Sequence, residues 1–243
     1  MHSQGGSTDR IPGLTLLSHS ASWRVGSRAL LPALSSGREE QLSRLAPAFV
    51  APGGGEPLSL GDPHLSRSPL RLAPGPEPGS ILLSRNGSPI EVEADGHAID
   101  AETVFSAAQV ERGAVLLLAS RVALLLHLLP READRFGLAG DGKLRREDVG
   151  PLFYLFLGEE LDALGARHRL DDPGPGGFSW MPARVVARIA GHPWQGGAQQ
   201  LRNAAREIAV AFHDAPEAGI PPAVERLFGA RTEPIAQIHN PNG

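Results

Sequence analysis

The pattern of apolar and polar positions divides the chain into two parts with different periodicities. In the first part, short apolar runs alternate with turn-forming residues, a pattern typical of an antiparallel β-sandwich. In the second part, the apolar residues recur at helical spacing. The pattern therefore predicts a mixed, α+β fold in which strands and helices occupy separate segments. The predicted segments are a disordered N-terminus at 1–13, a sandwich at 14–130, a linker at 131–143, a small α-helical region at 144–215 and a mostly irregular tail at 216–243.

The first part contains one long apolar stretch and several shorter runs. The long stretch, residues 115–129, is interrupted by Ser120, Arg121 and His127 and is shorter than the about 20 residues that a membrane-spanning helix needs. We interpret it as two buried strands around a turn at Ala119 and Ser120, and His127 as a satisfied or edge-facing histidine. The shorter expected strands lie at 14–17, 69–72, 81–84 and 90–93, with turns at Asn86–Gly87 and Asp95–Gly96.

Helical spacing dominates the second part. The first expected helix places Glu147 and Asp148 close to its positive N-terminal end, and Pro182 suits the first turn of the second helix. A break rich in Gly and Pro, residues 171–177, separates the two. The expected helices begin near 144, run from 182 to about 191 and from 198 to 213, and, on weaker signals, cover 222–229.

The amino-acid composition excludes several classes of function. Hydrophobic content of 41% and charged content of 21% over 243 residues are ordinary for a globular protein, and the net charge of −4 does not indicate binding to nucleic acid or to an anionic membrane. The absence of cysteine excludes disulfides and thiolate chemistry. The histidines show no metal-ligand spacing, and no Ser-His-Asp arrangement is visible. With no signal peptide and no membrane span in the sequence, we expect a cytoplasmic protein.

Three segments of the first part resemble the forkhead-associated (FHA) domain, a β-sandwich that reads phosphothreonine. Residues 24–28, RVGSR, resemble a strand that enters the family's Gly-Arg turn. Residues 65–70, LSRSPL, resemble its Ser-Arg-x-His loop, and residues 84–88, SRNGS, resemble its Ser-x-Asn-Gly-Thr loop. The resemblance implies an FHA-like sandwich that recruits a protein partner carrying phosphothreonine.

The same resemblance assigns roles to particular residues. Ser66 and Arg67 would donate to the phosphate, Arg28 would be the second basic contact, and Asn86 would fix the ligand backbone. The sequence departs from the family pattern because Ser27 directly follows the glycine, which shifts Arg28 by one position. A one-residue shift reverses the face to which a strand residue points. The family's loop histidine is also replaced, by a proline at position 69. A phosphate-independent interaction or a purely structural sandwich is the alternative interpretation.

The second part resembles the C-terminal portion of bacterial sigma-54-type AAA+ transcription activators. Residues 144–157, LRREDVGPLFYLFL, resemble the start of the helix that ends the family's catalytic core. Residues 180–203 contain HPWQGGAQQLRN, which resembles the family's HPWPGNVRELRN, the turn and helix of the lid subdomain. The resemblance implies an AAA+ lid without most of the ATPase core.

Three departures predict that ATPase activity is lost and that the chain is not an enzyme. The family's phosphate-sensing arginine falls on Gln199, which is uncharged. The family's loop for contacting the sigma factor and the acidic strand end that positions magnesium are both missing from the sequence. Gly137, Gly142 and Lys143 formally satisfy G-x-x-x-x-G-K, but the preceding segment is polar rather than a strand, so we interpret them as part of a glycine-rich linker. We therefore expect no cofactor.

Three functions compete. The first is a regulatory protein-interaction module, FHA-like and derived from a sigma-54 activator-type regulator. The alternative is an ATP-dependent activator that contacts sigma-54, with ATP as its cofactor. The second alternative is a DNA-binding helical module in the last two long helices, but Arg202 and Arg206 are its only basic contacts and Glu207 lies beside them.

Overall fold

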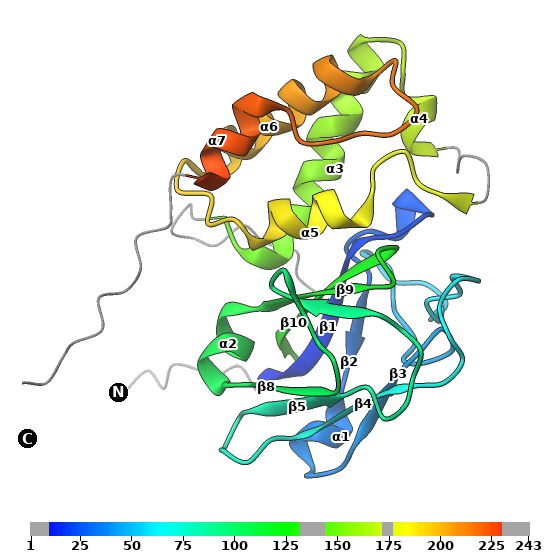
Figure 1. Cartoon of the computed structure of the whole chain (residues 1–243), viewed down its shortest axis with the longest axis vertical. Helices are drawn as coiled ribbons and strands as arrows, with labels where there is room; N and C mark the ends of the chain where they lie inside the picture. Colours follow the sequence, from blue (N-terminus) through cyan, green and yellow to red (C-terminus); the bar gives the residue numbers. More distant parts are fainter. Residues whose placement is uncertain (1–9, 132–143, 172–176, 230–243) are drawn as a thin grey trace, which may run out of the picture.

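The strands of the chain form two antiparallel sheets, and its longer helices form a third layer on one side of them (Figure 1). The structure, a computed structural model, describes residues 10–131, 144–171 and 177–229. The predicted α+β fold is confirmed. No helix in these ranges is both long and apolar enough to cross a membrane.

The larger sheet, sheet A, has six strands, and its centre is the antiparallel pair of β1 and β10. The prediction of two strands within residues 115–129 is confirmed: β9 and β10 are joined by a turn in which Ala119 and Ser120 have positive φ values of 48° and 55°. The order across the sheet is β2 (Arg28–Leu30), β1 (Arg10–Ser18), β10 (Val122–Pro130), β9 (Ala114–Leu118), β6 (Val92–Ala94) and β7 (His97–Ala98).

The smaller sheet, sheet B, has four strands and lies against one face of sheet A. The runs expected at 69–72 and 81–84 form β4 and β5, while the run at 90–93 contributes only the short β6 to the other sheet. Asn86 and Gly87 form the expected turn after β5, with φ values of 45° and 73°. The order across sheet B is β3 (Glu40–Leu42), β4 (Leu70–Pro74), β5 (Ile81–Ser84) and β8 (Glu102–Phe105).

The expected helices of the second part are confirmed, and shorter helices occur between strands. Helix α5 lacks a side-chain cap, and Pro182 occupies its N-cap position. Helix α2 begins with a capping box in which Ser106 and Gln109 bond each other's backbone. The helices are α1 (Pro32–Ser35), α2 (Ala107–Arg112), α3 (Arg146–Ala163), α4 (His168–Asp171), α5 (Ala183–Gly191), α6 (Gly197–Phe212) and α7 (Pro222–Gly229), with the 3₁₀ helix η1 at Ser22–Arg24.

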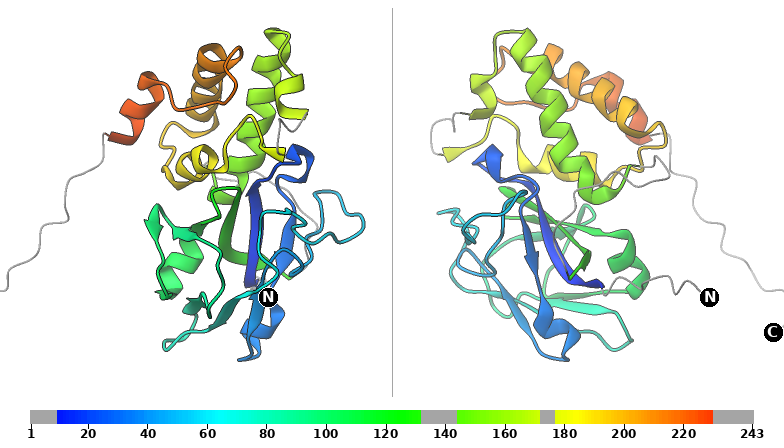
Figure 2. Two further views of the ribbon diagram at one scale, coloured as in Figure 1. Left: turned by 45° about the vertical axis from the view of Figure 1, so that its right-hand side comes forward. Right: turned by 180° about the vertical axis from the view of Figure 1, so that it is seen from behind.

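The long helices share a hydrophobic core with the outer face of sheet A, on the side away from sheet B (Figure 2). Helix α5 lies across β1, β9 and β10, and α3 approaches β1 closely at Gly150. A Cβ atom at Gly150 would lie 3.1 Å from the Cα and the carbonyl oxygen of Leu17, so a larger residue there would force the helix and the strand slightly apart. Buried residues from both parts, including Leu125, Phe153 and Val186, belong to this one core.

Candidate functional site

Two loops of the sandwich that carry the predicted phosphate contacts lie next to each other. Strands β4 and β5 pair antiparallel, with Arg71 opposite Ser84, so the loop before β4 and the loop after β5 emerge at the same edge. The hydroxyl of Ser88 donates to the carbonyl of Ser68 at 2.8 Å and ties the loops together. We call residues 65–69 and 85–88 the rim. The structure thus brings together the turns that contain Ser66, Arg67 and Asn86.

The rim presents groups that remain available to a ligand. The Ser66 hydroxyl accepts a hydrogen bond from the backbone amide of Ser68 at 3.0 Å, which leaves its own hydrogen free to donate. Arg67 is exposed and makes no hydrogen bond or ion pair within the described ranges. Asn86 is exposed at the tip of its turn. The rim therefore offers a guanidinium, a hydroxyl and an amide to solvent.

Two further arginines at the rim were missed by sequence reasoning. The backbone amide of Arg44 donates to the carbonyl of Ser66 at 3.2 Å, and its guanidinium lies 3.4 Å from the carbonyl of Pro63. Arg85 is held more firmly, because its guanidinium donates to the carbonyls of Asp100 and Ser88 at 3.2 and 3.3 Å. Arg85 directly precedes the Asn-Gly turn, which was an available signal, whereas nothing in the sequence connects Arg44 with Ser66.

Arg28, the fourth predicted phosphate contact, is placed elsewhere. It begins β2 opposite Thr15, on the face of sheet A that points to the helices. Its positive charge helps to lower the pKa of Glu147 of α3 and opposes the burial that raises the pKa of the neighbouring Asp148. The shift by one residue relative to the family pattern explains this placement, since neighbouring strand residues point to opposite faces. The four predicted residues therefore do not form one cluster.

The residues predicted for nucleotide binding under the ATP alternative, Gly137, Gly142 and Lys143, lie outside the described ranges. Gln199, at the position of the family's sensor arginine, is exposed, and its side-chain amide donates to Asn203 on the same helix at 3.1 Å. Trp194 of the lid-like motif is buried, and its indole N–H donates to the carbonyl of Ile189 at 2.9 Å. This tryptophan fixes the turn between α5 and α6.

A buried hydrogen-bonded chain joins sheet A to the start of α3. The Thr15 hydroxyl lies 2.7 Å from Nε2 of His127, and Nδ1 of His127 lies 3.1 Å from a carboxylate oxygen of Glu147. The interpretation of His127 as a satisfied histidine is confirmed. The order hydroxyl, imidazole, carboxylate is that of a nucleophilic triad. Thr15, however, is fully buried in the middle of β1, where no substrate can reach it. The hydrogen bonds from Thr15 through His127 to Glu147 therefore hold the start of α3 against sheet A.

Two adjacent carboxyls of α3 have pKa values that move in opposite directions. Burial alone would raise the pKa of Glu147, but the hydrogen bond and charge of His127, with the charges of Arg28 and Arg145, outweigh it and lower the pKa. Burial, reinforced by the charge of Glu147, raises the pKa of Asp148. One carboxylate oxygen of Asp148 is buried and has no hydrogen-bond partner among the described residues. Burial thus dominates at Asp148, whereas the partners of Glu147 override it.

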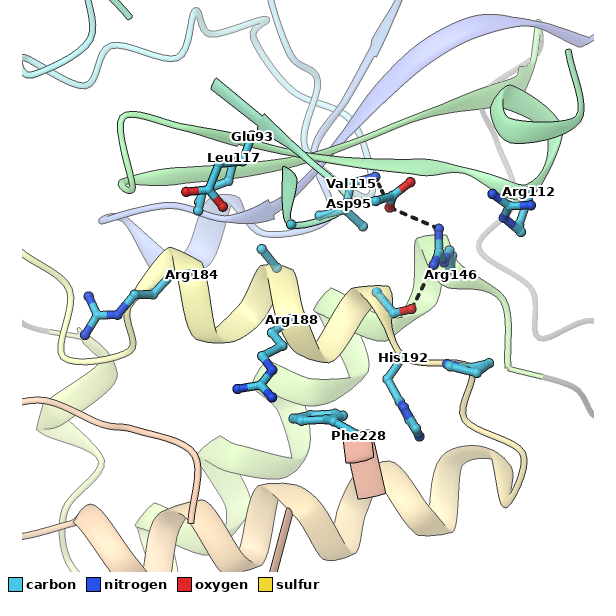
Figure 3. A pocket seen from close by; sticks show the side chains of 14 residues that line it. Glu93, Asp95, Arg112, Val115, Leu117, Arg146, Arg184, Arg188, His192 and Phe228 are labelled. Carbon is cyan, nitrogen blue, oxygen red and sulfur yellow. Dashed lines mark hydrogen bonds and ion pairs between the residues drawn. The ribbon is translucent and has the colours of Figure 1, made fainter. Parts of the chain in front are cut away.

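A cavity of about 680 Å³ lies between the outer face of sheet A and the helices (Figure 3). Its apolar surface comes from β9 and α5, and four arginines from three helices surround it. We call it the seam cavity. Its lining consists of Glu93, Asp95, Gly96, Arg112, Val115, Leu117, Arg146, Arg184, Ala187, Arg188, Gly191, His192, Pro193 and Phe228.

The arginines of the seam cavity differ in how firmly they are held. Arg146 donates to the carbonyls of Gly113 and Gly191 and pairs with Asp95 at 3.5 Å. Burial lowers the pKa of Arg146, Asp95 opposes this effect, and the nearby charge of Arg112 adds to it. Arg112 is exposed at the end of α2 and makes no hydrogen bond or ion pair with any described residue. An uncompensated positive charge therefore lies at this end of the cavity.

Comparisons with known proteins add little to this geometry. No known protein family matches the chain, and no curated protein matches it. Among solved structures, the chain is similar to the FHA domain of the CT664 protein from Chlamydia trachomatis, with 22% sequence identity and a TM-score of 0.33 over 49% of this chain and 97% of that domain.

Proposed function

We propose that the chain is a regulatory protein-interaction module whose FHA-like sandwich binds a phosphothreonine-containing partner at the rim. Its helical layer derives from a sigma-54 activator-type transcription regulator and has lost ATPase activity. The observation that carries the binding proposal is the hydrogen bond from Ser88 to Ser68, which holds the turns of Arg67 and Asn86 side by side. The lid-like motif around Trp194 supports the proposed origin of the helical layer.

The rim supplies the chemistry that a phosphothreonine dianion requires. A guanidinium can bind two phosphate oxygens at once, and charge-assisted hydrogen bonds of this kind are about twice as strong as neutral ones. Arg67 is exposed and pairs with none of the described residues, so binding breaks no ion pair among them. Ser66 has a hydroxyl hydrogen to donate, and the Asn86 amide can both donate to and accept from the backbone of an extended peptide.

Arg44 takes the role of second basic contact that the sequence assigned to Arg28. Its backbone is bonded to Ser66, so its guanidinium begins next to the phosphate-binding hydroxyl. The 3.4 Å contact between this guanidinium and the carbonyl of Pro63 is long for a hydrogen bond and is easily exchanged for a phosphate oxygen. Arg28 instead faces the carboxyls of α3, and their negative charge favours this position over one at the rim.

Titration with phosphothreonine peptides tests the proposal. We would measure binding of a peptide pool with a fixed central phosphothreonine, and of the same pool with unmodified threonine, to the whole chain. Arg67→Ala should weaken binding of the phosphorylated pool by about tenfold or more, because a charged hydrogen bond is lost. Arg206→Ala is the matched control, since Arg206 is equally exposed and uncommitted but lies on α6.

Two outcomes would contradict recognition of phosphothreonine at the rim. If the phosphorylated and unmodified pools bind equally, the partner is recognised without its phosphate. If Arg67→Ala and Arg206→Ala bind the phosphorylated pool alike, the rim is not the site.

The proposed loss of ATPase activity has its own test. Gln199 bonds Asn203 on its own helix and carries no charge that could contact a nucleotide phosphate. Calorimetry with ATP and magnesium should therefore show no binding. Binding that disappears in Lys143→Ala would instead support the ATP-dependent activator.

The DNA-binding alternative receives little support from α6. Its Arg202 pairs with Glu159 of α3 and lies over the ring of Phe156 at 4.2 Å, so it is engaged within the protein. Salt-dependent binding to duplex DNA would nevertheless revive this alternative.

A further inference from the structure

The seam cavity is separate from the rim and is built from different elements. The rim consists of loops at the edge of sheet B, whereas the seam cavity is formed by the outer face of sheet A together with α2, α3, α5 and α7. A phosphopeptide bound at the rim makes no use of the cavity, and nothing in the proposed function explains its arginines.

The cavity has an apolar surface and a cationic end. Val115 and Leu117 of β9, both almost fully buried, form its floor, and the half-buried Ala187 of α5 and Phe228 of α7 add apolar surface. Arg112 and Arg146 lie together at one end, while Leu117 lies toward the other (Figure 3). Such a combination of apolar walls with a few placed polar groups is characteristic of sites for small molecules.

The cationic end carries more positive charge than its surroundings balance. Arg112 and Arg146 are close enough for their charges to oppose each other. Among the residues that the structure describes, Asp95 is the carboxylate that pairs with Arg146, and it also accepts a hydrogen bond from the backbone of Val115 at 3.1 Å. Asp95 is therefore satisfied by partners within the protein, while Arg112 has none among the described residues. An anion placed between the two guanidinium groups would relieve their repulsion.

The remaining arginines of the cavity can adapt to a ligand. Arg184 and Arg188 pair with Glu217 and Glu225, and all four side chains are about half exposed. Exposed ion pairs contribute little free energy, so either arginine can exchange its carboxylate for an anionic group of a ligand.

We propose that the seam cavity binds a small organic anion, with its charged group between Arg112 and Arg146 and a planar apolar body against Val115, Leu117 and Ala187. The cavity volume of about 680 Å³ lies within the range of small-molecule sites. A ligand bound there touches both β9 and α5 and so stabilises the contact between sheet A and the helices.

A fluorescent naphthalene series provides the probes, because it separates the charge from the apolar body. We would titrate the whole chain by calorimetry with 1-naphthyl phosphate, 1-naphthoate, 1-naphthol and inorganic phosphate. Both naphthyl anions should show saturable binding, the phosphate more tightly than the carboxylate because of its second charge. The neutral naphthol and inorganic phosphate should each bind at least about tenfold more weakly, since naphthol lacks the charged group and inorganic phosphate lacks the apolar ring.

Three variants locate the binding. Arg112→Gln removes an uncommitted charge and should weaken 1-naphthyl phosphate at least about tenfold. Ala187→Phe fills the cavity from a half-buried position and should abolish binding, with circular dichroism to show that the variant is folded. Arg67→Ala at the rim should bind the probe like the unmodified chain, which separates this site from the phosphopeptide site.

The proposal is overturned if 1-naphthyl phosphate fails to saturate the unmodified chain. It is equally overturned if folded Arg112→Gln and Ala187→Phe both bind the probe as the unmodified chain does. Loss of binding in Arg67→Ala alone would assign the anion to the rim and contradict the seam cavity. Failure of phosphopeptide binding, by contrast, leaves these results unaffected.

Discussion

The two faces of sheet A differ in chemistry, although the same strands supply both. On the inner face, Leu16 of β1 and Leu124 of β10 are fully buried against sheet B in a wholly apolar layer. On the outer face, the apolar Leu125 is followed along β10 by the polar His127, and Thr15 of the neighbouring strand β1 is hydrogen-bonded to His127. The inner face needs only hydrophobic burial. The outer face also needs hydrogen-bond partners, and Glu147 of α3 supplies one of them.

The helical layer therefore completes the sheet rather than simply lying beside it. Without the helical layer, His127 would lose its partner Glu147 of α3, and the apolar area of β10 that α5 covers would face water. Hydrophobic burial and satisfied polar groups both favour folding of the two parts together. The stabilities of the two parts are therefore expected to be coupled.

The largest effect is expected from Phe153→Ala. Phe153 is fully buried in the core that α3 shares with sheet A. Removing a buried aromatic ring leaves a cavity and should lower the free energy of unfolding by about 3–5 kcal/mol. Urea unfolding followed by tryptophan fluorescence and by circular dichroism should show one transition, shifted by the same amount with both probes.

Leu155→Ala is the matched control on the same helix. Leu155 is 54% exposed, so its truncation should change the free energy of unfolding by no more than about 0.5 kcal/mol. Two separate transitions, with only the helical one moved by Phe153→Ala, would show that the two faces of sheet A are independent.

A smaller effect is expected at the end of the outer face, where Arg121 joins both parts. Its guanidinium pairs with the buried Asp62 at 3.3 Å and donates to the carbonyl of Gly177 at 2.7 Å. Arg121→Met keeps the length of the side chain but leaves the Asp62 charge uncompensated, and should cost about 3 kcal/mol. Thermal unfolding measures the loss.

The double variant Arg121→Met, Asp62→Leu identifies the cause of that loss. It removes both charges, so it should recover part of the stability if the stranded carboxylate is responsible. If the double variant is only as stable as Arg121→Met, the stranded carboxylate is not the cause, and the bond to Gly177, which both variants lack, accounts for the loss.

The pH dependence of Glu147 provides a third test. Its pKa in the folded chain is below the ordinary value of 4.5, so the ionised carboxylate stabilises the fold above that pH, and this stabilisation is lost as the pH falls through the folded pKa. Glu147→Gln keeps a hydrogen-bond acceptor for His127 but loses the charge. At pH 7 it should cost about 1 kcal/mol, and the difference from the unmodified chain should shrink on acidification.

Asp148→Asn is the control with the opposite sign. Burial raises the pKa of Asp148 above its ordinary value of 3.8, so the ionised form costs stability at neutral pH and this cost disappears on acidification. Asp148→Asn should therefore raise the free energy of unfolding at pH 7. Equal losses from both substitutions would mean that the hydrogen-bonded chain through His127 has no special role.

The inner face of sheet A and the long helices were predictable from the sequence because local periodicity determines them. The run at 115–129 gave β9 and β10, and the helical spacing gave α5 and α6 within a residue or two. Short edge strands such as β2 and β7 were not predicted, since two or three residues carry no periodicity.

A candidate binding residue could be predicted from the sequence only where it lies in a turn with a recognisable local motif. Asn86 and Arg67 were predicted as contacts because each lies in a recognisable loop, and the structure brings those two loops together. Arg44 joins Ser66 through a contact between distant segments, and Arg28 is directed by strand register, which a shift of one residue reverses. The seam cavity forms where β9, α5 and α7 come together, and no local sequence pattern predicts contacts between such distant segments.

The smallest effect is expected at the solvent side of the seam, in Glu217→Gln. Glu217 pairs with Arg184 where both side chains are about half exposed, so the pair is screened by water and its loss should change the free energy of unfolding by less than about 0.5 kcal/mol. Equilibrium urea unfolding at low and high salt measures it. A loss as large as that of Arg121→Met would mean that Arg184 is locked to Glu217 and cannot turn to a ligand. A small loss leaves the arginine free to do so, in contrast to the buried pair of Arg121 and Asp62.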